Sequence, residues 1–310
     1  IGLKSFRDDL IIFCRNSIHK LININDSNNI AVVPVTQNVG CLSSHSIQEI
    51  GGDLVFLSPD GIRSVAGTAR IGDVELGSVS RQIQSIISDI ALAINSFTIT
   101  SAVLRSKSQY RLFYTSDNAS PQASKGIIGT LTSNGFEWSE TLGIQAAGLT
   151  SGFNSDGIEK ELHGDLAGYI YNHDTGNSFI SAESPFDIDA QYTTPNFDFG
   201  DIGTRKTLHY AKISITPEGE VQPTLRVRYD YEDTEIPQPA DYILDTVPLP
   251  AIFGTSVFGT AIFGASNDPM LRQAIQGSGS VCNFRIRSSD QNAPYAINGL
   301  YINYVPSGRR

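Results

Sequence analysis

A recurring unit of an apolar strand, a turn and a second strand constrains the fold of this chain more than any other feature. In one copy, the apolar run 53–57 leads through Ser58-Pro59-Asp60-Gly61 into a second run at 62–65. This tetrapeptide favours a tight turn, because proline fixes φ and glycine permits a positive φ. The other copies join 10–13 to 17–21, 110–114 to 126–129, and 161–164 to 168–171. The sequence therefore predicts four β-hairpins before residue 190.

The spacing of these units indicates how they are arranged. They recur roughly every 45–60 residues, close to the about 40–50 residues of a β-propeller blade. A blade cannot bury both of its faces alone, so blades pack side by side around an axis. We expect residues 1–190 to form such blades. The propeller is expected to be incomplete, since the chain begins at Ile1 without an initiating methionine.

One stretch departs from the β pattern. Residues 78–93 carry apolar side chains at helical spacing, namely Val79, Ile83, Ile86, Ile87 and Ile90. The sequence predicts an amphipathic helix inserted between blades, with Ser78 or Ser80 as its N-cap. Packing on its own domain is the favoured interpretation of the apolar face, and partner binding is the alternative.

From about Ala190 the pattern changes to strands with alternating side chains. In 224–229, the Leu, Val and Tyr side chains fall on one face. Other predicted strands are 206–215, 281–287 and parts of 295–305, with a turn at 217–219. These strands predict an antiparallel β-sandwich at 191–310. The predicted fold class is thus mainly β, with propeller blades, one inserted helix and a C-terminal sandwich.

Between those strands, residues 251–264 repeat Phe-Gly every five residues. Five is neither a strand period nor a helix period, and Pro237, Pro248 and Pro250 precede the repeat. The sequence predicts a long loop whose aromatic side chains cover a surface. That surface is either the chain's own sandwich or a neighbouring subunit. Phe253, Phe258 and Phe263 are accordingly the candidate subunit interface.

The charge of the chain argues against tight binding of nucleic acid. The formal net charge is −10, and no run of lysine or arginine occurs. A protein that grips nucleic acid through its phosphates needs a basic patch. An acidic wall past which DNA slides without adhering remains compatible with this composition. No apolar run is long enough to cross a membrane, so membrane insertion is not expected.

The sequence contains no recognised catalytic, cofactor or metal motif. Cys14, Cys41 and Cys282 have unrelated spacings and are predicted to be free, buried thiols. The pairs His163/Asp165 and His173/Asp174 form the only His/Asp cluster, and polarity at turns and edges is its favoured interpretation. Ser43-Ser44-His45-Ser46 lacks the Gly-x-Ser-x-Gly context of a nucleophilic serine. We therefore expect no enzymatic activity, no cofactor and no metal site.

Three segments carry a resemblance to a known family. Residues 39–65, which include Cys41-Leu42-Ser43-Ser44-His45 and Ser58-Pro59-Asp60-Gly61-Ile62-Arg63, look like a blade of the tail nozzle (tail tubular) proteins of short-tailed bacteriophages. Similar blades occur in the hub and packaged-DNA-stabilisation proteins of these phages. Residues 197–206 and 297–310 resemble segments common in such virion proteins. A full nozzle protein is expected to be longer than this chain.

This resemblance implies a structural role in the virion. The protein would be made in the host cytoplasm and would assemble as a homo-oligomeric ring, commonly six-fold, below the tail adaptor. Its partners would be the adaptor and tail fibre proteins. Viral DNA would be retained behind the ring and released through its lumen without specific binding. Nozzle proteins have no catalytic residues to transfer to this chain.

Two other functions fit parts of the sequence. Trp138, Tyr169 and Tyr171 could stack on sugars in a carbohydrate-binding or receptor-binding tail module. A glycan hydrolase would need two carboxylates facing one cleft at roughly 5–10 Å. Only scattered candidates such as Glu159, Glu161 and Asp165 are available for that role.

Overall fold

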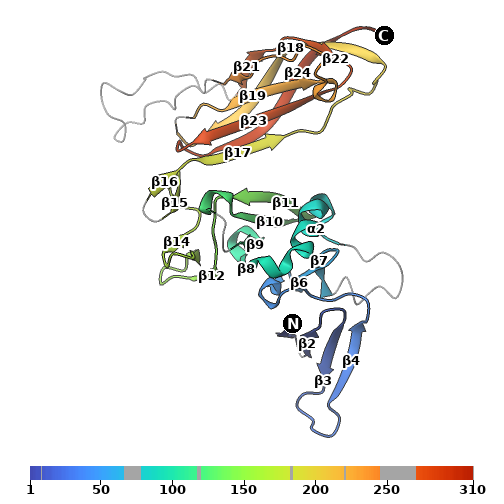
Figure 1. Cartoon of the computed structure of the whole chain (residues 1–310), viewed down its shortest axis with the longest axis vertical. Coiled ribbons are helices and arrows are strands. Elements are labelled where there is room, and N and C mark those ends of the chain that lie inside the picture. Colours follow the sequence, from blue (N-terminus) through green and yellow to red (C-terminus); the bar gives the residue numbers. More distant parts are fainter. Residues whose placement is uncertain are drawn as a thin grey trace. The chain divides into compact units, whose positions relative to one another are not determined.

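The computed structural model describes residues 1–7, 9–65, 78–116, 120–181, 184–219, 221–244 and 270–309. They form two compact units, Ile1–Thr175 (unit 1) and Gly176–Arg310 (unit 2), coloured from blue to yellow-green and from yellow to red in Figure 1. Strands make up 54% of the structure and all sheets are antiparallel, which confirms the predicted mainly β class. The sequence pattern changes at about residue 190, whereas the boundary between the two units falls between Thr175 and Gly176 in the chain.

Unit 1 consists of four antiparallel meanders that follow one another along the chain. Each predicted hairpin lies within one meander, so all four hairpins are confirmed. Meander 1 contains β1 (Gly2–Phe6), β2 (Asp9–Phe13), β3 (Ile18–Ile22) and β4 (Ala31–Thr36). Meander 2 contains β5 (Gln48–Ile50), β6 (Asp53–Ser58) and β7 (Gly61–Ser64). Meander 3 contains β8 (Thr98–Leu104), β9 (Gln109–Thr115), β10 (Lys125–Thr132) and β11 (Gly135–Leu142). Meander 4 contains β12 (Gly148–Phe153), β13 (Glu159–Gly164) and β14 (Ile170–Asn172).

The turn of meander 2 shows how the local sequence sets a hairpin. Ser58 pairs with Gly61, which has a φ of 149°. The carboxylate of Asp60 accepts hydrogen bonds from Ser58 Oγ at 3.0 Å and from Arg63 Nε at 2.9 Å. These side-chain bonds fix the turn that the Pro-Asp-Gly motif predicts.

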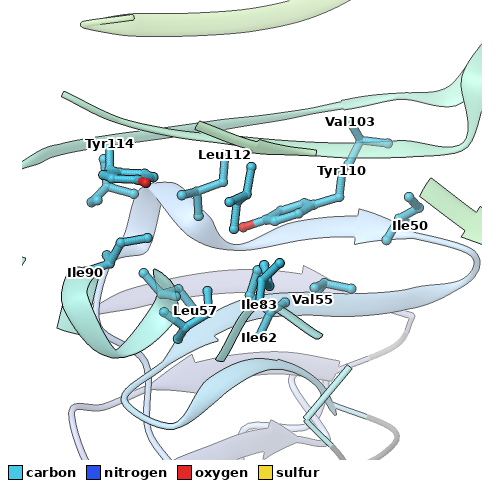
Figure 2. Packing of buried hydrophobic residues seen from close by; sticks show 13 residues of the cluster. Ile50, Val55, Leu57, Ile62, Ile83, Ile90, Val103, Tyr110, Leu112 and Tyr114 are labelled. Carbon is cyan, nitrogen blue, oxygen red and sulfur yellow. The ribbon is translucent and has the colours of Figure 1, made fainter. Parts of the chain in front are cut away.

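The inserted helix packs on its own unit. A 3₁₀ turn, η2 (Arg81–Ile83), leads into α2 (Gln84–Leu92). Ile83, Ile87 and Ile90 are buried in a core that also contains Leu57, Ile62, Tyr110 and Leu112. Figure 2 shows the helical isoleucines beside the β6–β7 hairpin, with side chains of β9 facing them. The favoured interpretation of the apolar helix face is therefore confirmed.

Of the two serines predicted as a cap, Ser78 accepts the backbone N–H of Ser80 at 3.3 Å, whereas Ser80 occupies the N-cap position but makes no capping hydrogen bond. Its Oγ instead accepts a hydrogen bond from the backbone N–H of Ile62 at 2.8 Å. The hydroxyl joins the helix start to β7, because the buried N–H of that strand needs an acceptor.

Strand β6 is buried on both faces and separates two cores. Val55 and Leu57 point into the core of the helix, whereas Leu54 and Phe56 join a second core. That second core also contains Phe13 and Ile18 of meander 1. Meanders 1 and 2 therefore share a buried apolar interface.

The connection between these meanders includes a close backbone approach at Gly40. A Cβ built on Gly40 would lie 1.9 Å from the carbonyl oxygen of Arg15. The neighbouring Cys41 N–H donates to Cys14 O at 2.9 Å, so this segment is held in place. Only glycine fits at this point without movement of the backbone.

We expect Gly40→Ala to destabilise unit 1 by about 3 kcal/mol, because the clash is with backbone rather than with a mobile side chain. Trp138 is the only tryptophan and lies in unit 1, so its fluorescence during urea unfolding measures the effect. Gly148→Ala is the control, since a Cβ there meets no atom within 4 Å. Equal stability of the two variants would contradict the prediction.

Unit 2 contains two four-stranded antiparallel sheets and a short hairpin. The hairpin consists of β15 (Phe179–Ser181) and β16 (Ser184–Phe186). One sheet has the order β17 (Ile188–Thr193), β23 (Cys282–Asp290), β19 (Thr224–Tyr229) and β20 (Tyr242–Ile243). In the other, β18 (Thr204–Pro217) pairs with β21 (Met270–Ala274), β22 (Ser278–Gly279) and β24 (Tyr295–Arg309). The strands predicted in this region are therefore confirmed.

The two sheets of unit 2 share one core. Ala211 and Ile213 of β18 lie in the same buried cluster as Val227 of β19 and Phe284 and Ile286 of β23. The alternation in β19 places Leu225, Val227 and Tyr229 inside, as the sequence predicts. Among the described strands, no sheet closes on itself.

The Phe-Gly segment 251–264, with Phe253, Phe258 and Phe263, lies outside the described residues. Its predicted loop structure therefore stays a prediction. In the described part of the chain, no helix is long and apolar enough to cross a membrane.

Candidate functional site

A polar cavity of about 630 Å³ in unit 1 is lined by residues from the first strand of every meander and by the segments that lead into β5, β8 and β12. The contributions are Lys4 of β1, Gln48 of β5, Thr98–Ser101 of β8, and Gly148 and Leu149 of β12. The first strands of the four meanders thus face one common space, although they are far apart in sequence.

Hydrogen bonds across this cavity join neighbouring meanders. Gln48 Nε2 donates to the carbonyl oxygen of Ser101 at 2.9 Å and to its Oγ at 3.2 Å. Ser101 Oγ in turn donates to His45 O. Thr100 Oγ1 is buried and has no hydrogen-bond partner among the described residues. The lining therefore offers hydroxyl, amide and backbone groups that suit a polar ligand.

A charged cluster with a buried centre lies between meanders 3 and 4, and we define it as Lys107, Arg111, Glu161, His163, His173 and Asp174. Arg111 on β9 donates to the carboxylate of Glu161 on β13, and its other terminal nitrogen lies 2.8 Å from Asp174 Oδ2. Lys107 Nζ contacts the same oxygen of Asp174 at 2.7 Å. The side chains of Arg111 and Glu161 are only 5% and 1% exposed.

The two histidines of the cluster converge. His163 Nδ1 lies 2.7 Å from His173 Nε2, and His173 Nδ1 lies 3.4 Å from Glu161 Oε2. The ring of Tyr171 stacks on His163 with centroids 5.0 Å apart, and Phe113 meets His173 edge-on at 5.6 Å. Turn and edge polarity is therefore the wrong interpretation of His173, whose side chain is 3% exposed, and His163 is half-buried beside it. Asp165 does stabilise a turn, because its carboxylate accepts the N–H groups of Ala167 and Tyr169.

Burial dominates the protonation of the cluster. It raises the pKa of Glu161 to about 7, although Arg111 acts in the opposite direction. Burial also lowers the pKa of His173 to about 3, and the nearby charge of Arg111 and the neighbouring His163 contribute. The pKa of His163 is lowered mainly by burial as well. Burial works to raise the pKa of Asp174, but hydrogen bonds from Arg111 and Lys107 outweigh it and hold this pKa below its usual value.

No protein-family model matches the chain, and neither does any curated protein. The described part of unit 1 thus contains two polar sites. One is the lining of the cavity, and the other is the charged cluster between meanders 3 and 4. Within the described ranges, no group of three or more His, Cys, Asp or Glu side chains is placed to hold a metal ion.

The serines around His45 have structural roles. Ser43 is the N-cap of η1 (Ser44–Ser46), where its Oγ accepts the N–H of His45 at 3.3 Å. Ser46 Oγ donates to Ser43 O at 2.6 Å and accepts the N–H of Leu57 at 3.1 Å. These hydroxyls satisfy backbone groups near the second core.

The carboxylates considered for glycan hydrolysis have separate partners. Glu159 accepts the backbone N–H groups of Arg105 and Ser106 at 3.0 and 2.7 Å. Asp165 accepts the N–H of Ala167 and the hydroxyl of Tyr171. With Glu161 bound to Arg111, each carboxylate stabilises a different contact.

Of the aromatic side chains considered for sugar stacking, Trp138 is engaged in packing. Its indole N–H donates to Val79 O at 2.6 Å, and its ring stacks on Phe136 with centroids 5.4 Å apart. Tyr171 stacks on His163, whereas Tyr169 is 40% exposed. The rings of Tyr169 and Tyr171 lie side by side with centroids 6.3 Å apart, whereas Trp138 packs elsewhere, so the structure brings together two of the three rings.

The three cysteines are free. Cys41 and Cys282 are buried as predicted, whereas Cys14 is half-buried. Burial raises the pKa of the Cys282 thiol to about 12, and that of Cys41 also lies above its usual value. Both buried thiols are therefore protonated at neutral pH and poorly nucleophilic.

The residue that sequence reasoning missed is Arg111. It stands within the apolar run Tyr110-Arg111-Leu112-Phe113-Tyr114, which becomes a central strand. A charged residue in such a run is costly to bury unless it has a partner. That mismatch was the signal that could have pointed to a buried counter-ion.

Proposed function

We propose that this chain is a structural virion protein, a subunit of the tail nozzle ring of a short-tailed bacteriophage. The observation that carries the proposal is the cavity lined by the first strands of all four meanders. Propeller blades place their first strands around a common axis in this way. We infer that unit 1 is a set of propeller blades and that the two sheets of unit 2 form a β-sandwich.

The polar contacts between the meanders of unit 1 support a structural role. The charged cluster, the Gln48–Ser101 bonds and the Ser151 Oγ bond to Val103 O at 2.7 Å all join one meander to another. The net charge of −10 suits a wall that repels DNA phosphates. In this proposal the ring binds the tail adaptor and fibre proteins, and viral DNA passes through its lumen.

Ring formation tests the proposal. The purified chain is expected to form closed rings, six-fold by the family resemblance, in negative-stain images, and to show no binding of double-stranded DNA at physiological salt. A monomer at high protein concentration by analytical ultracentrifugation, with no rings in the images, would contradict it. Tight DNA binding that weakens with salt would contradict the non-adhesive lumen.

One observation favours a carbohydrate-binding or receptor-binding tail module as the second candidate. The cavity of unit 1 is lined by hydroxyl and amide groups, and Thr100 Oγ1 lacks a partner among the described residues. Such groups hydrogen-bond to sugar hydroxyls. Binding on a glycan array that Gln48→Ala abolishes would support this function, and an array without signal would remove it.

A further inference from the structure

An apolar groove of about 640 Å³ opens along one side of unit 2. It lies where β17 and β24 form the edges of their sheets. Strand β17 contributes Ile188, Ala190 and Tyr192, which alternate along one face. Strand β24 contributes residues that include Ile297, Leu300 and Ile302. The groove is therefore the opening between the two sheets of this unit.

The core of unit 2 reaches the surface through this groove. Ile297, Leu300 and Ile302 pack against the buried cluster but are themselves only partly buried. At the rim, Tyr192 is 55% exposed and Phe197 is 36% exposed. A contiguous apolar surface of this kind is typical of a site that another chain covers.

The opposite side of unit 2 carries the ends of a long apolar segment. Residues 245–269 connect β20 with β21. Strand β20 is the far edge of the sheet that begins with β17, and β21 pairs with the side of β18 that faces away from β24. The groove and the ends of the segment are thus at opposite edges, about 15 Å apart for a four-stranded sheet.

The composition of the segment complements the groove. Residues 251–264 contain no charged side chain and present Phe253, Phe258 and Phe263. The groove is lined mainly by apolar groups, together with hydroxyls and amides such as those of Thr194, Ser288 and Asn298 and the carboxylate of Asp290. Uncharged aromatic side chains are enriched where such surfaces meet.

We propose that the Phe-Gly segment 251–264 of one copy docks into the groove between β17 and β24 of a second copy. This inference rests on the proposed ring, for which it names the subunit contact. Because the described ends of the segment lie at the edge opposite the groove, the contact is head-to-tail. Head-to-tail contacts produce rings when the rotation between copies closes.

Disulfide trapping tests the contact directly. A chain with Ala190→Cys and one tag is mixed with a chain with Phe258→Cys and another tag, under mild oxidation. A cross-linked band that carries both tags is expected for this mixture and for neither variant alone. A chain with both substitutions that cross-links only within itself at every concentration would overturn the proposal, since the segment would then fill its own groove.

Complementation tests whether one copy supplies the segment and the other supplies the groove. Ala190→Arg should block the groove, and Phe253→Ser/Phe258→Ser/Phe263→Ser should disable the segment; each is expected to weaken self-association at least about 100-fold. Mixing the two variants should restore pairs, because each retains the half that the other lacks. Thr193→Arg, at an exposed position of β17 that does not line the groove, is the control and should assemble normally. Failure of the mixture to pair would overturn the head-to-tail contact.

These experiments separate this inference from the proposed function. Rings that form in the Ala190→Arg variant would overturn the groove contact and leave the nozzle proposal in place. Cross-linked copies without rings would support the contact and contradict the nozzle proposal.

Discussion

Replacing Arg111 with methionine is expected to lower the free energy of unfolding of unit 1 by about 3–5 kcal/mol at pH 8. The substitution retains an apolar stem of similar length, but it leaves Glu161 without its cation in a site where the carboxylate is 1% exposed. It also removes a partner of Asp174. An uncompensated buried charge carries a large free-energy penalty.

The cost of this substitution should fall at lower pH. Since burial already raises the pKa of Glu161 to about 7, the carboxyl group of the variant is protonated at pH 5 and needs no cation. Trp138 fluorescence during urea unfolding at pH 8 and pH 5 measures both values, because the only tryptophan lies in unit 1.

A half-exposed ion pair in the same unit provides the control. Lys125 Nζ lies 3.6 Å from Glu140 Oε1, and both side chains are more than a third exposed. Lys125→Met should therefore change stability by less than about 1 kcal/mol at either pH. Equal effects of Arg111→Met and Lys125→Met would mean that the charged cluster does not stabilise the junction of meanders 3 and 4.

The second large effect is a pair of opposite pH dependences within the same cluster. The pKa of Glu161 rises from 4.5 to about 7 on folding, so its contribution to stability is complete below pH 4.5 and is lost as the pH rises through 7. The pKa of His173 falls from 6.5 to about 3, so its contribution is complete above pH 6.5 and is lost as the pH falls through 3. Between pH 4.5 and 6.5, the free energy of unfolding changes with pH by about 1.4 kcal/mol per pH unit for each group, and the two changes have opposite signs.

If one of the two groups is removed, the free energy of unfolding should follow the pH dependence of the other. Between pH 6.5 and 4.5, Glu161→Gln is expected to lose about 2–3 kcal/mol of stability relative to the wild type. Over the same range, His173→Gln is expected to gain a similar amount relative to the wild type. Because the pKa of His163 is also lowered, the wild type itself should lose some stability on acidification.

Urea unfolding followed at half-unit steps of pH measures these slopes. His19 lies in meander 1 beside Ser17 and outside the cluster, so His19→Gln controls for the loss of a histidine as such. Parallel pH profiles of Glu161→Gln and His173→Gln would contradict the assignment of opposite shifts.

Local sequence predicted the elements of this fold better than their arrangement. The Pro-Asp-Gly turn, the helix at 78–93 and the alternation at 224–229 all depend on neighbouring residues, and the structure contains each of them. The cap by Ser80 failed because its hydroxyl bonds to Ile62 on a distant strand. No local pattern contains that long-range contact.

The candidate site was less predictable for the same reason. Arg111, Glu161 and His173 lie on separate segments, and only the packing of meander 3 against meander 4 brings them together. The shared lining of the polar cavity by β1, β5, β8 and β12 also follows from tertiary packing. A charged residue within an apolar strand was the one local sign of the buried cluster.

The pairing of strands also sets the order in which the two units fold during synthesis. Each meander of unit 1 pairs strands that are neighbours in the sequence, so it can form soon after it leaves the ribosome. In unit 2, Ile188 pairs with Asp290 and Thr204 with Arg309, which places partners about a hundred residues apart. Strands β17 and β18 therefore remain unpaired, with their apolar side chains exposed, until β23 and β24 have been synthesised. We therefore expect unit 2 to expose apolar strands for longer than unit 1 during synthesis.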